Sequence, residues 1–213
     1  MAIASISEQG LKGKKGPNVY YSVEGITYVR QYVRPDHSKP SELQLAGWSK
    51  FKVANRFAGP LREAFNLGFI NYRKGMRSPA KVGLGLLLKK AFRDGLPEPD
   101  PALVQISAGS LTGMENGKVD RSDGQHVLVQ WDNNTGTGNA AGRDRVSLLL
   151  YDVLHQKAFF MAEGNPRSAG QQEFHVPYAE KHLGNLHVYA FFTFKNPVNQ
   201  NHQVSDSTYL GLI

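Results

Sequence analysis

Residues 186–194 read LHVYAFFTF and form the clearest strand pattern in the sequence. Successive side chains of a β-strand point to opposite faces of its sheet. One face therefore carries Leu186, Val188, Ala190, Phe192 and Phe194. The other face carries His187, Tyr189, Phe191 and Thr193. The first set is typical of a protein core, and the second is too aromatic for a face that meets only solvent.

Six further β-rich runs share the region 102–213 with this strand. They are LVQISA (103–108), HVLVQW (126–131), VSLLLYDV (146–153), KAFFMAE (157–163), QEFHV (172–176) and QVSDSTYLG (203–211). Turn clusters rich in Gly, Asn and Asp separate them. Seven short strands in a region of this length predict an immunoglobulin- or fibronectin-like β-sandwich. The segment LPEPDP (96–101) marks the expected boundary in front of this C-terminal domain.

The region 1–95 has a different residue pattern, and its first predicted element is a β-hairpin. The runs VYYSV (19–23) and ITYVRQYV (26–33) flank Glu24-Gly25, and glycine supplies the positive φ that a tight hairpin turn requires. An isolated two-stranded ribbon is only marginally stable in water. We therefore expect the hairpin to pack on the rest of its own chain or on a neighbouring molecule.

Two helices are predicted after the hairpin. Ser41 and Gln44 have the spacing of a capping box, which starts a helix. Its apolar stripe is Leu45, Trp48, Phe51, Ala54, Phe57, Leu61, Ala64 and Phe65. Cationic residues lie off the stripe, and Gly59-Pro60 is expected to kink or divide the helix. A second helix is predicted from Ser78-Pro79 to Gly95. We expect Trp48, on the stripe, and Trp131, at a strand end, to be core residues.

Charge is unequal along the chain. Residues 1–93 contain 17 Lys and Arg against five acidic residues, a net charge of +12, whereas residues 94–213 contain eight against 13, a net charge of −5. This asymmetry suits nucleic acid, an acidic surface, or the acidic half of a neighbouring copy as a partner. A solvated basic face without any partner remains an alternative.

Several functional classes lack sequence support. The absence of cysteine excludes disulfides and thiolate nucleophiles. GTGNAAG (136–142) has the wrong spacing for a dinucleotide loop and precedes a predicted strand rather than a helix. The seven histidines show neither the i, i+4 spacing of a helical metal pair nor an HExxH motif. Asn116, Asp120 and Asp123 lack the alternation of a calcium loop and are predicted to lie in a surface hairpin loop. We expect no catalytic residue, cofactor, metal site or small-molecule substrate.

The sequence bears on localisation only through the targeting signals that it lacks. No run approaches the about 18 apolar residues of a membrane span, and the first residues lack the pattern of a secretory signal peptide. We therefore expect no membrane insertion, and either cytoplasmic synthesis or a place in a virion or similar assembly.

A family resemblance spans nearly the whole chain. Its blocks are GLKGKKGPNVYYSVEGITYVR, KPSELQLAGWSKFKVANRFAGPL, AAGRDRVSLLLYDV, NPRSAG, LHVYAFF and VSDSTYLG. Their order resembles an uncharacterised family of proteins of roughly 200 residues from Bacteroidota, known only as a domain of unknown function. The segment that starts the first helix is also similar to segments of phage-type structural proteins. The resemblance implies no activity, cofactor or site residue.

These observations together predict an α+β protein. It has an N-terminal arm, β-hairpin and basic helical segment over residues 1–95, and a β-sandwich over residues 102–213. We expect a non-enzymatic structural protein that self-assembles, as a coat, tube or filament-type subunit, through its hairpin and the edges of its sandwich. The hairpin residues expected to contact another copy are Tyr20, Tyr21, Ile26, Tyr28 and Tyr32.

The alternative is a module that binds DNA or RNA through the basic half. Cations that contact phosphates, interleaved with aromatic side chains that stack on bases, supply the required chemistry. The candidate residues are Lys12, Lys14, Lys15, Arg30, Arg34, Arg73, Lys74, Arg77, Lys89 and Lys90.

Overall fold

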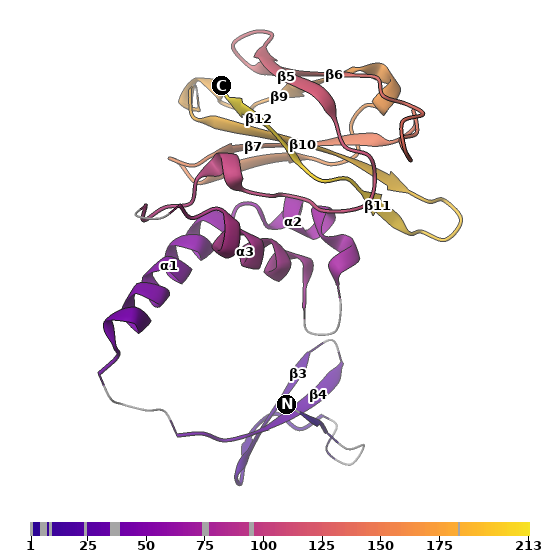
Figure 1. The fold of residues 1–213 in the computed structure, drawn as a ribbon. Helices are drawn as coiled ribbons and strands as arrows, with labels where there is room; N and C mark the ends of the chain where they lie inside the picture. Colours follow the sequence, from indigo (N-terminus) through magenta and orange to yellow (C-terminus); the bar gives the residue numbers. More distant parts are fainter. Residues whose placement is uncertain are drawn as a thin grey trace. The chain divides into compact units, whose positions relative to one another are not determined.

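The structure is a computed structural model of the 213-residue chain. It describes residues 2–4, 8, 10–23, 25–34, 39–73, 77–93, 96–182 and 184–213. The chain forms two compact units, residues 1–45 and residues 46–213, which are each described by themselves. Figure 1 labels most of their helices and strands.

The first unit contains a four-stranded antiparallel sheet with the strand order β1-β4-β3-β2. The predicted hairpin is confirmed, because β3 (Asn18–Val23) pairs with β4 (Ile26–Gln31) across a turn in which Gly25 has a φ of 80°. The N-terminal arm supplies β1 (Ala2–Ile3) beside β4 and β2 (Gly13–Lys15) beside β3. Strands of the hairpin's own arm therefore flank it on both sides.

The helices begin and end largely as their capping signals indicate. α1 (Glu42–Ala58) starts with the predicted capping box, in which the Ser41 amide donates to Gln44 Oε1 at 2.9 Å and the Gln44 amide donates to Ser41 Oγ at 3.3 Å. Gly59 and Pro60 separate α1 from α2 (Arg62–Gly68), so the expected division is confirmed.

The second predicted helix is α3 (Pro79–Lys90). It ends before the expected Gly95, which lies outside the described residues. A single 3₁₀ turn, η2 (Ile70–Tyr72), follows α2. Within the described part of the chain, none of the helices has the length and apolar character that crossing a bilayer requires.

Two antiparallel sheets make up the rest of the second unit. In the larger sheet, β10 (Leu186–Lys195) pairs with β7 (Arg145–Asp152), which pairs with β8 (Lys157–Met161). The other side of β10 pairs with β11 (His202–Val204) and β12 (Thr208–Leu212), so the sheet has five strands. The smaller sheet has the order β5 (Glu115–Arg121), β6 (His126–Asp132) and β9 (Gln171–His175).

In the C-terminal region one expected strand is wrong, one strand was missed, and the single strand expected over 203–211 is divided into β11 and β12. Residues 103–108 leave the 3₁₀ turn η3 (Pro101–Leu103) and form no strand; instead Ile106 N donates to Ser207 Oγ at 2.9 Å and Ser107 Oγ to the Ser205 carbonyl at 2.8 Å. Polar residues 115–121, expected to lie in a loop, form β5, which contains Asn116 and Asp120. Strand pairing with β6 thus outweighs the weak β propensity of ENGKVDR.

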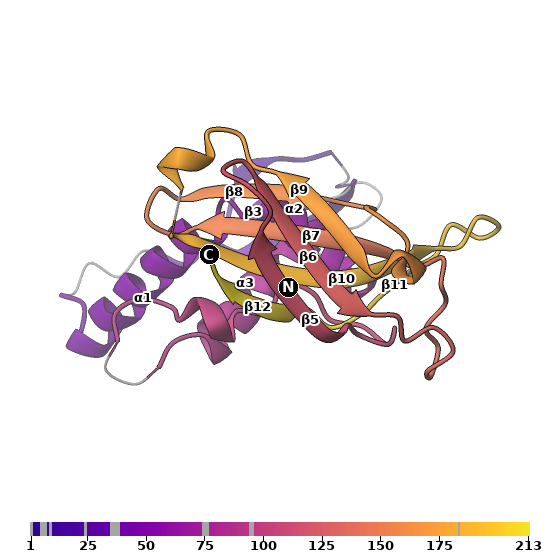
Figure 2. The ribbon, with the colours of Figure 1, turned by 90° about the horizontal axis from the view of Figure 1, so that it is seen from above.

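The five-stranded sheet lies between the smaller sheet and the helices, as Figures 1 and 2 show. Trp131, Leu148 and Phe192 belong to the core between the two sheets. On the opposite face, Tyr151 and Phe191 pack with residues of α1, α2 and α3 in a second core. The helices therefore cover the aromatic face of residues 186–194, which confirms that this face is not simply solvated.

These layers make the protein α+β. The helices α2, α3 and most of α1 belong to the same compact unit as both β-sheets. The boundary expected at residues 96–101 lies inside this unit, because the second apolar face of the larger sheet is buried by residues that precede that boundary.

Candidate functional site

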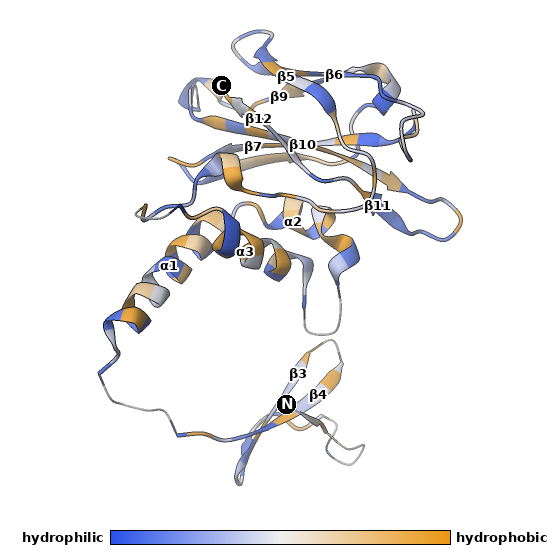
Figure 3. Ribbon diagram, viewed as in Figure 1, coloured by the Kyte–Doolittle hydropathy of each residue, from blue (hydrophilic) through white to orange (hydrophobic). Residues whose placement is uncertain are grey.

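An exposed row of large apolar side chains lies on α1. Leu45, Trp48 and Phe51 follow one another at i, i+3 spacing, which places neighbours on one side of a helix. They are 50%, 61% and 52% exposed, respectively. We call these three residues the α1 strip. Figure 3 shows that apolar residues occur along the whole of α1, including its N-terminal turns.

The expectation that Trp48 is a core residue is therefore wrong. Only the C-terminal part of α1 packs into the core, through Ala54, Phe57 and Ala58. The apolar stripe of the helix is longer than the surface that covers it. Trp131 is confirmed as a core residue, 5% exposed, and its Nε1 donates to the Arg167 carbonyl at 2.8 Å.

Positive charge is concentrated in the helical layer. Residues 46–93 contain 11 Lys and Arg against the single acidic residue Glu63, a net charge of +10. Ion pairs to the loop before η3 engage Arg56, with Glu98 at 2.9 Å, and Arg93, with Asp100. Residues 94–213 have a net charge of −5. Exposed acidic side chains on the smaller sheet, on the other side of the larger sheet from the helices, are Glu115, Asp120, Asp132 and Glu173.

The hairpin tyrosines lie on different faces of the N-terminal sheet. Tyr21 and Tyr28 are cross-strand partners whose rings stack with centroids 5.8 Å apart. Ile26 shares their face by strand alternation and is 42% exposed. Tyr20 lies on the opposite face, is buried, and donates from its hydroxyl to Glu8 Oε1 at 3.1 Å. Tyr20 therefore offers little contact area in this structure.

Cations join the tyrosines on this face. Lys14 Nζ lies 3.7 Å from the centroid of the Tyr32 ring, which is a cation–π contact. Arg30 is exposed and alternates onto the same face as Tyr28. We call Lys14, Tyr21, Ile26, Tyr28, Arg30 and Tyr32 the hairpin face.

The nucleic-acid candidates are divided between the two units. Lys12, Lys14, Lys15, Arg30 and Arg34 belong to the first unit, and Arg73, Arg77, Lys89 and Lys90 belong to the second. All nine are exposed, and Lys90 Nζ donates to Gln105 Oε1 at 3.1 Å. Lys74 lies outside the described residues.

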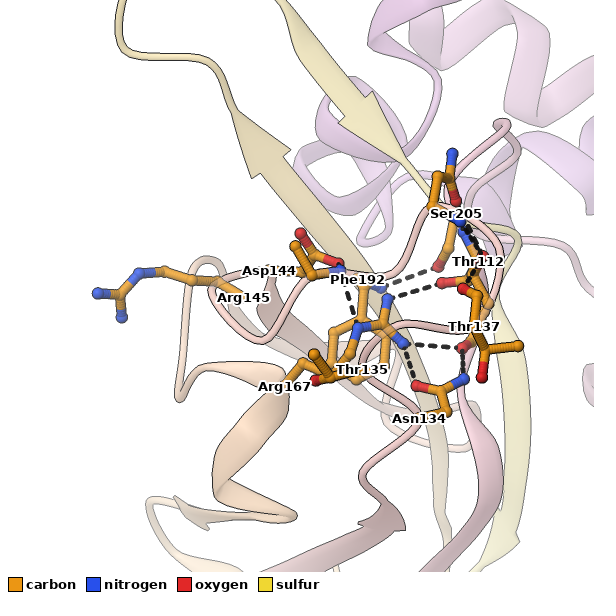
Figure 4. Close-up of polar contacts among 12 residues, drawn as sticks. Thr112, Asn134, Thr135, Thr137, Asp144, Arg145, Arg167, Phe192 and Ser205 are labelled. Atoms are coloured by element: carbon orange, nitrogen blue, oxygen red, sulfur yellow. Dashed lines mark hydrogen bonds and ion pairs between the residues drawn. The ribbon is translucent and has the colours of Figure 1, made fainter.

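Arg167 is fully buried and holds several loops together, as Figure 4 shows. Its Nε donates to Asp144 Oδ2 at 3.1 Å, and its terminal nitrogens donate to Asn134 Oδ1 at 2.6 Å and to the carbonyls of Gly113 and Thr112 at 3.0 and 2.7 Å. The guanidinium carbon lies 3.7 Å from the centroid of the Phe192 ring.

This arrangement ties three loop segments to one guanidinium. Burial lowers the pKa of Arg167, while the charge of Asp144 and its hydrogen bond act in the opposite direction. Nε and both terminal nitrogens of Arg167 donate hydrogen bonds within the protein, to Asp144, Asn134 and two loop carbonyls. Asp144 belongs to the sequence block AAGRDR and Arg167 to the block NPRSAG. The two blocks thus meet at one buried ion pair.

A second buried carboxylate, Asp152, joins two histidines at one end of the larger sheet. Asp152 is the last residue of β7, His155 lies in the turn before β8, and His182 follows the 3₁₀ turn η5 (Ala179–Lys181). Asp152 Oδ2 lies 2.7 Å from Nδ1 of His155 and 2.7 Å from Nδ1 of His182. Within the described residues, these three form the group of potential ligands that could hold a metal ion.

The electrostatics of Asp152 favour its ionised form. Burial raises the pKa of Asp152, but hydrogen bonds from the His155 amide and from the rings of His182 and His155 together outweigh burial and lower it. Two nearby residues, Gln156 and Tyr178, have the positive φ values of 52° and 53°. Non-glycine residues in this conformation cost free energy and are enriched at functional sites.

Sequence reasoning missed this cluster because it tested helical spacing. His155 and His182 are 27 positions apart and meet only through the fold. The available signal was local: Asp152 precedes His155 by three residues, which suits a carboxylate that caps a turn, and the Asp152 carboxylate accepts from the His155 amide at 2.9 Å.

Comparison with known proteins gives a family match. A family model matches residues 10–211, and the family is described as one of unknown function. The resemblance to an uncharacterised family is thereby confirmed. No curated protein matches the chain.

Proposed function

Because the chain belongs to DUF6266, a family of unknown function, we propose its function from its surface chemistry: it is a non-enzymatic structural protein whose copies self-assemble. The assembly is of the coat, tube or filament type, and other copies of the chain are the principal partners. The α1 strip, the charge distribution and the sheet edges support this assembly.

The α1 strip carries the proposal. A surface helix of a water-soluble protein normally turns its apolar side toward a core and its polar side toward solvent. Trp48 and Phe51 instead expose more than half of their side chains. Large aromatic side chains bury on the order of 150–250 Å² each when fully covered, so covering the exposed half of one contributes on the order of 2 kcal/mol. A partner surface would thus stabilise this part of α1.

The charge distribution supports a second copy as that partner. The helical segment that follows Leu45 carries +10, and residues 94–213 carry −5. Contact between the helical layer of one molecule and the acidic smaller sheet of another pairs opposite charges around an apolar centre. Such a contact joins two different surfaces, and repeated contacts of this kind build rings or open polymers.

Two further surfaces support the same assembly. β8 lies at one end of the larger sheet and pairs with β7 alone among the described strands, so its other edge is open to strand addition. The hairpin face offers Tyr21, Ile26, Tyr28 and Tyr32 as aromatic and aliphatic contact area. The hairpin and the sheet edges then add to the contact made by α1.

We also propose that the two packed sheets are a relative of the immunoglobulin- or fibronectin-like sandwich. Their antiparallel strands and shared apolar core support this assignment. The helical layer on the larger sheet is an addition to such a sandwich, and it is the layer that carries the α1 strip.

Light scattering of purified full-length protein tests the proposal. Wild-type protein is expected to form species larger than a monomer, and Trp48→Ser combined with Phe51→Ser is expected to shift them toward monomer. Leu43→Ser is the control for loss of an exposed apolar side chain from α1, because Leu43 is 85% exposed and lies about 160° from Leu45 and about 140° from Trp48 around the helix. A monomeric wild type at all concentrations, or equal effects of both changes, would refute self-assembly through α1.

A second candidate function is binding of single-stranded DNA or RNA, favoured by the hairpin face. Tyr21, Tyr28 and Tyr32 share it with Lys14 and Arg30, which combines stacking rings with phosphate-binding cations. Binding of this kind weakens by about 0.7 log units per log unit of salt for each phosphate contacted. Absence of any retardation of DNA or RNA at low salt would exclude it.

A further inference from the structure

The end of the larger sheet at Asp152 combines groups that metal ions bind. Asp152 is the last residue of β7. The turn toward β8 places the His155 ring within hydrogen-bonding distance of the Asp152 carboxylate. The turn η5 contributes His182 from a distant part of the sequence. The rings of His155 and His182 meet edge to face with centroids 5.6 Å apart, and Phe159 packs against His182 with centroids 5.1 Å apart.

Charge compensation of Asp152 is unusual. Its side chain is fully buried, and within the described parts of the chain its ion pairs are both with histidines. The lysines on the adjoining elements face other groups: Lys157 Nζ lies 5.9 Å from the Phe159 ring centroid, and Lys181 Nζ lies 5.3 Å from the Tyr178 ring centroid. A buried carboxylate normally has a permanent cation or a metal ion beside it. Among the described residues, the two imidazoles and the His155 amide occupy that place.

We propose that Asp152, His155 and His182 form a binding site for a single divalent transition-metal ion of the zinc class. Two imidazole nitrogens and one carboxylate oxygen are ligands that Zn²⁺ accepts, and hard ions such as Mg²⁺ or Ca²⁺ prefer sites made of oxygen alone. The side chain of His182 is 10% exposed and that of His155 is 50% exposed, so the site opens toward solvent on the His155 side. A water molecule supplies the fourth ligand there.

The candidate ligand atoms of the three residues all lie within 4.8 Å of one another. Zinc lies about 2.0–2.2 Å from nitrogen and oxygen ligands, which places tetrahedral ligands about 3.3 Å apart. The two Nδ1 atoms are 2.7 Å from Asp152 Oδ2, so each would move away from it by about 0.6 Å. His155 lies in a turn with a half-exposed ring, and this residue has the freedom to move. The site fixes the β7–β8 turn to the segment after η5, which is a structural role.

The test uses full-length protein stripped of metal by dialysis against a chelator and titrated with zinc sulfate by isothermal calorimetry. We expect one zinc ion per chain, and loss of more than about tenfold in affinity in both His155→Gln and His182→Gln. His126→Gln is the matched control. His126 also follows an aspartate by three residues, with Nδ1 2.8 Å from Asp123 Oδ2, but that carboxylate is exposed.

The titration shows whether Asp152, His155 and His182 bind zinc. Zinc bound at one per chain, with affinity lost in both cluster variants and kept in His126→Gln, supports the site. Absence of stoichiometric binding, or equal affinity in wild type and both cluster variants, overturns it and leaves a hydrogen-bonded turn. Circular dichroism checks folding, and if His182→Gln fails to fold, the half-exposed His155 keeps the test valid.

Discussion

Arg167 and Asp144 form an ion pair of 3.1 Å between Nε and Oδ2, and both side chains are almost completely buried. The pair joins the loop before β7 to the 3₁₀ turn η4 (Arg167–Ala169) at the edge of the core between the two sheets. Two of the sequence blocks that carry the family resemblance, AAGRDRVSLLLYDV and NPRSAG, therefore meet at this pair.

Replacement of Asp144 by asparagine tests this structural role. Asp144→Asn leaves the Arg167 guanidinium buried without its counter-charge, so the free energy of unfolding should fall by about 3–5 kcal/mol. Urea denaturation measures the change. The control is Asp120→Asn, an exposed position on β5, which should alter stability by no more than about 0.5 kcal/mol. A loss of less than about 1 kcal/mol in Asp144→Asn would contradict the assigned role.

Two glycines of α3 should respond in opposite directions to alanine. A Cβ atom at Gly83 would lie 2.6 Å from the ring of Phe65, whereas a Cβ atom at Gly85 meets nothing within 4 Å. Gly83→Ala should therefore destabilise the protein by roughly 1–3 kcal/mol through overpacking. Gly85→Ala should stabilise it by about 0.5–1 kcal/mol, since alanine is the better helix former. Thermal unfolding measures both, and changes of the same sign would refute the packing of α3 on α2.

The hydroxyl of Tyr151 should make stability depend on alkaline pH. Burial, aided by the charge of Asp152, raises the pKa of Tyr151 to about 12, and its hydroxyl donates to the Phe57 carbonyl of α1 at 3.1 Å. Between the unfolded pKa of about 10 and the folded pKa, the unfolded chain loses this proton while the folded protein keeps it. Stability should thus be intact below about pH 10 and fall by up to about 1.4 kcal/mol per pH unit above it.

The variant Tyr151→Phe isolates this contribution. It should lose about 1 kcal/mol at neutral pH, because the hydrogen bond to α1 disappears. Its stability should then decline less steeply than that of the wild type between pH 10 and about 12. Denaturant unfolding at several pH values measures both slopes. Equal slopes would show that Tyr151 is not the group responsible.

The start of α1 and its separation from α2 could be predicted from the sequence, because each depends on neighbouring residues. The capping box at Ser41 and the division at Pro60 come from nearest-neighbour chemistry, and both are confirmed. The double-sided pattern of residues 186–194 also predicted a covered second face. Sequence periodicity does not say which residues cover such a face. It therefore does not show that the helices before residue 96 pack on this sheet.

Features that depend on tertiary context rather than on a local sequence signal were not predicted. Residues 115–121 become a strand because β6 offers a pairing edge, although their own propensity is weak. Trp48 is exposed because the surface beneath α1 ends before the apolar stripe does. Asp152 and His182 meet only when β7 and η5 reach the same end of the larger sheet. Only the pair Asp152 and His182 depends on residues far apart in the sequence, because β6 directly follows β5 in the chain.

The N-terminal unit should contribute to assembly if the hairpin face contacts another copy. Deletion of residues 1–33 should leave a smaller species in light scattering, and Tyr28→Ser should weaken association in the same direction, because it removes the stack on Tyr21. Tyr178→Ser, at a 72% exposed tyrosine of the second unit, is the control for loss of an aromatic side chain. An unchanged mass after the deletion would exclude the hairpin from the contact.

Tryptophan accessibility as a function of protein concentration tests self-assembly through α1 most directly. The chain has two tryptophans, and Trp131 is buried within the core, so Trp48 dominates quenching by acrylamide. Quenching should fall as concentration rises, with the same midpoint as the increase in mass, because a second copy covers the α1 strip. Strong quenching that stays constant while the mass increases would contradict the account, since assembly would then proceed without α1.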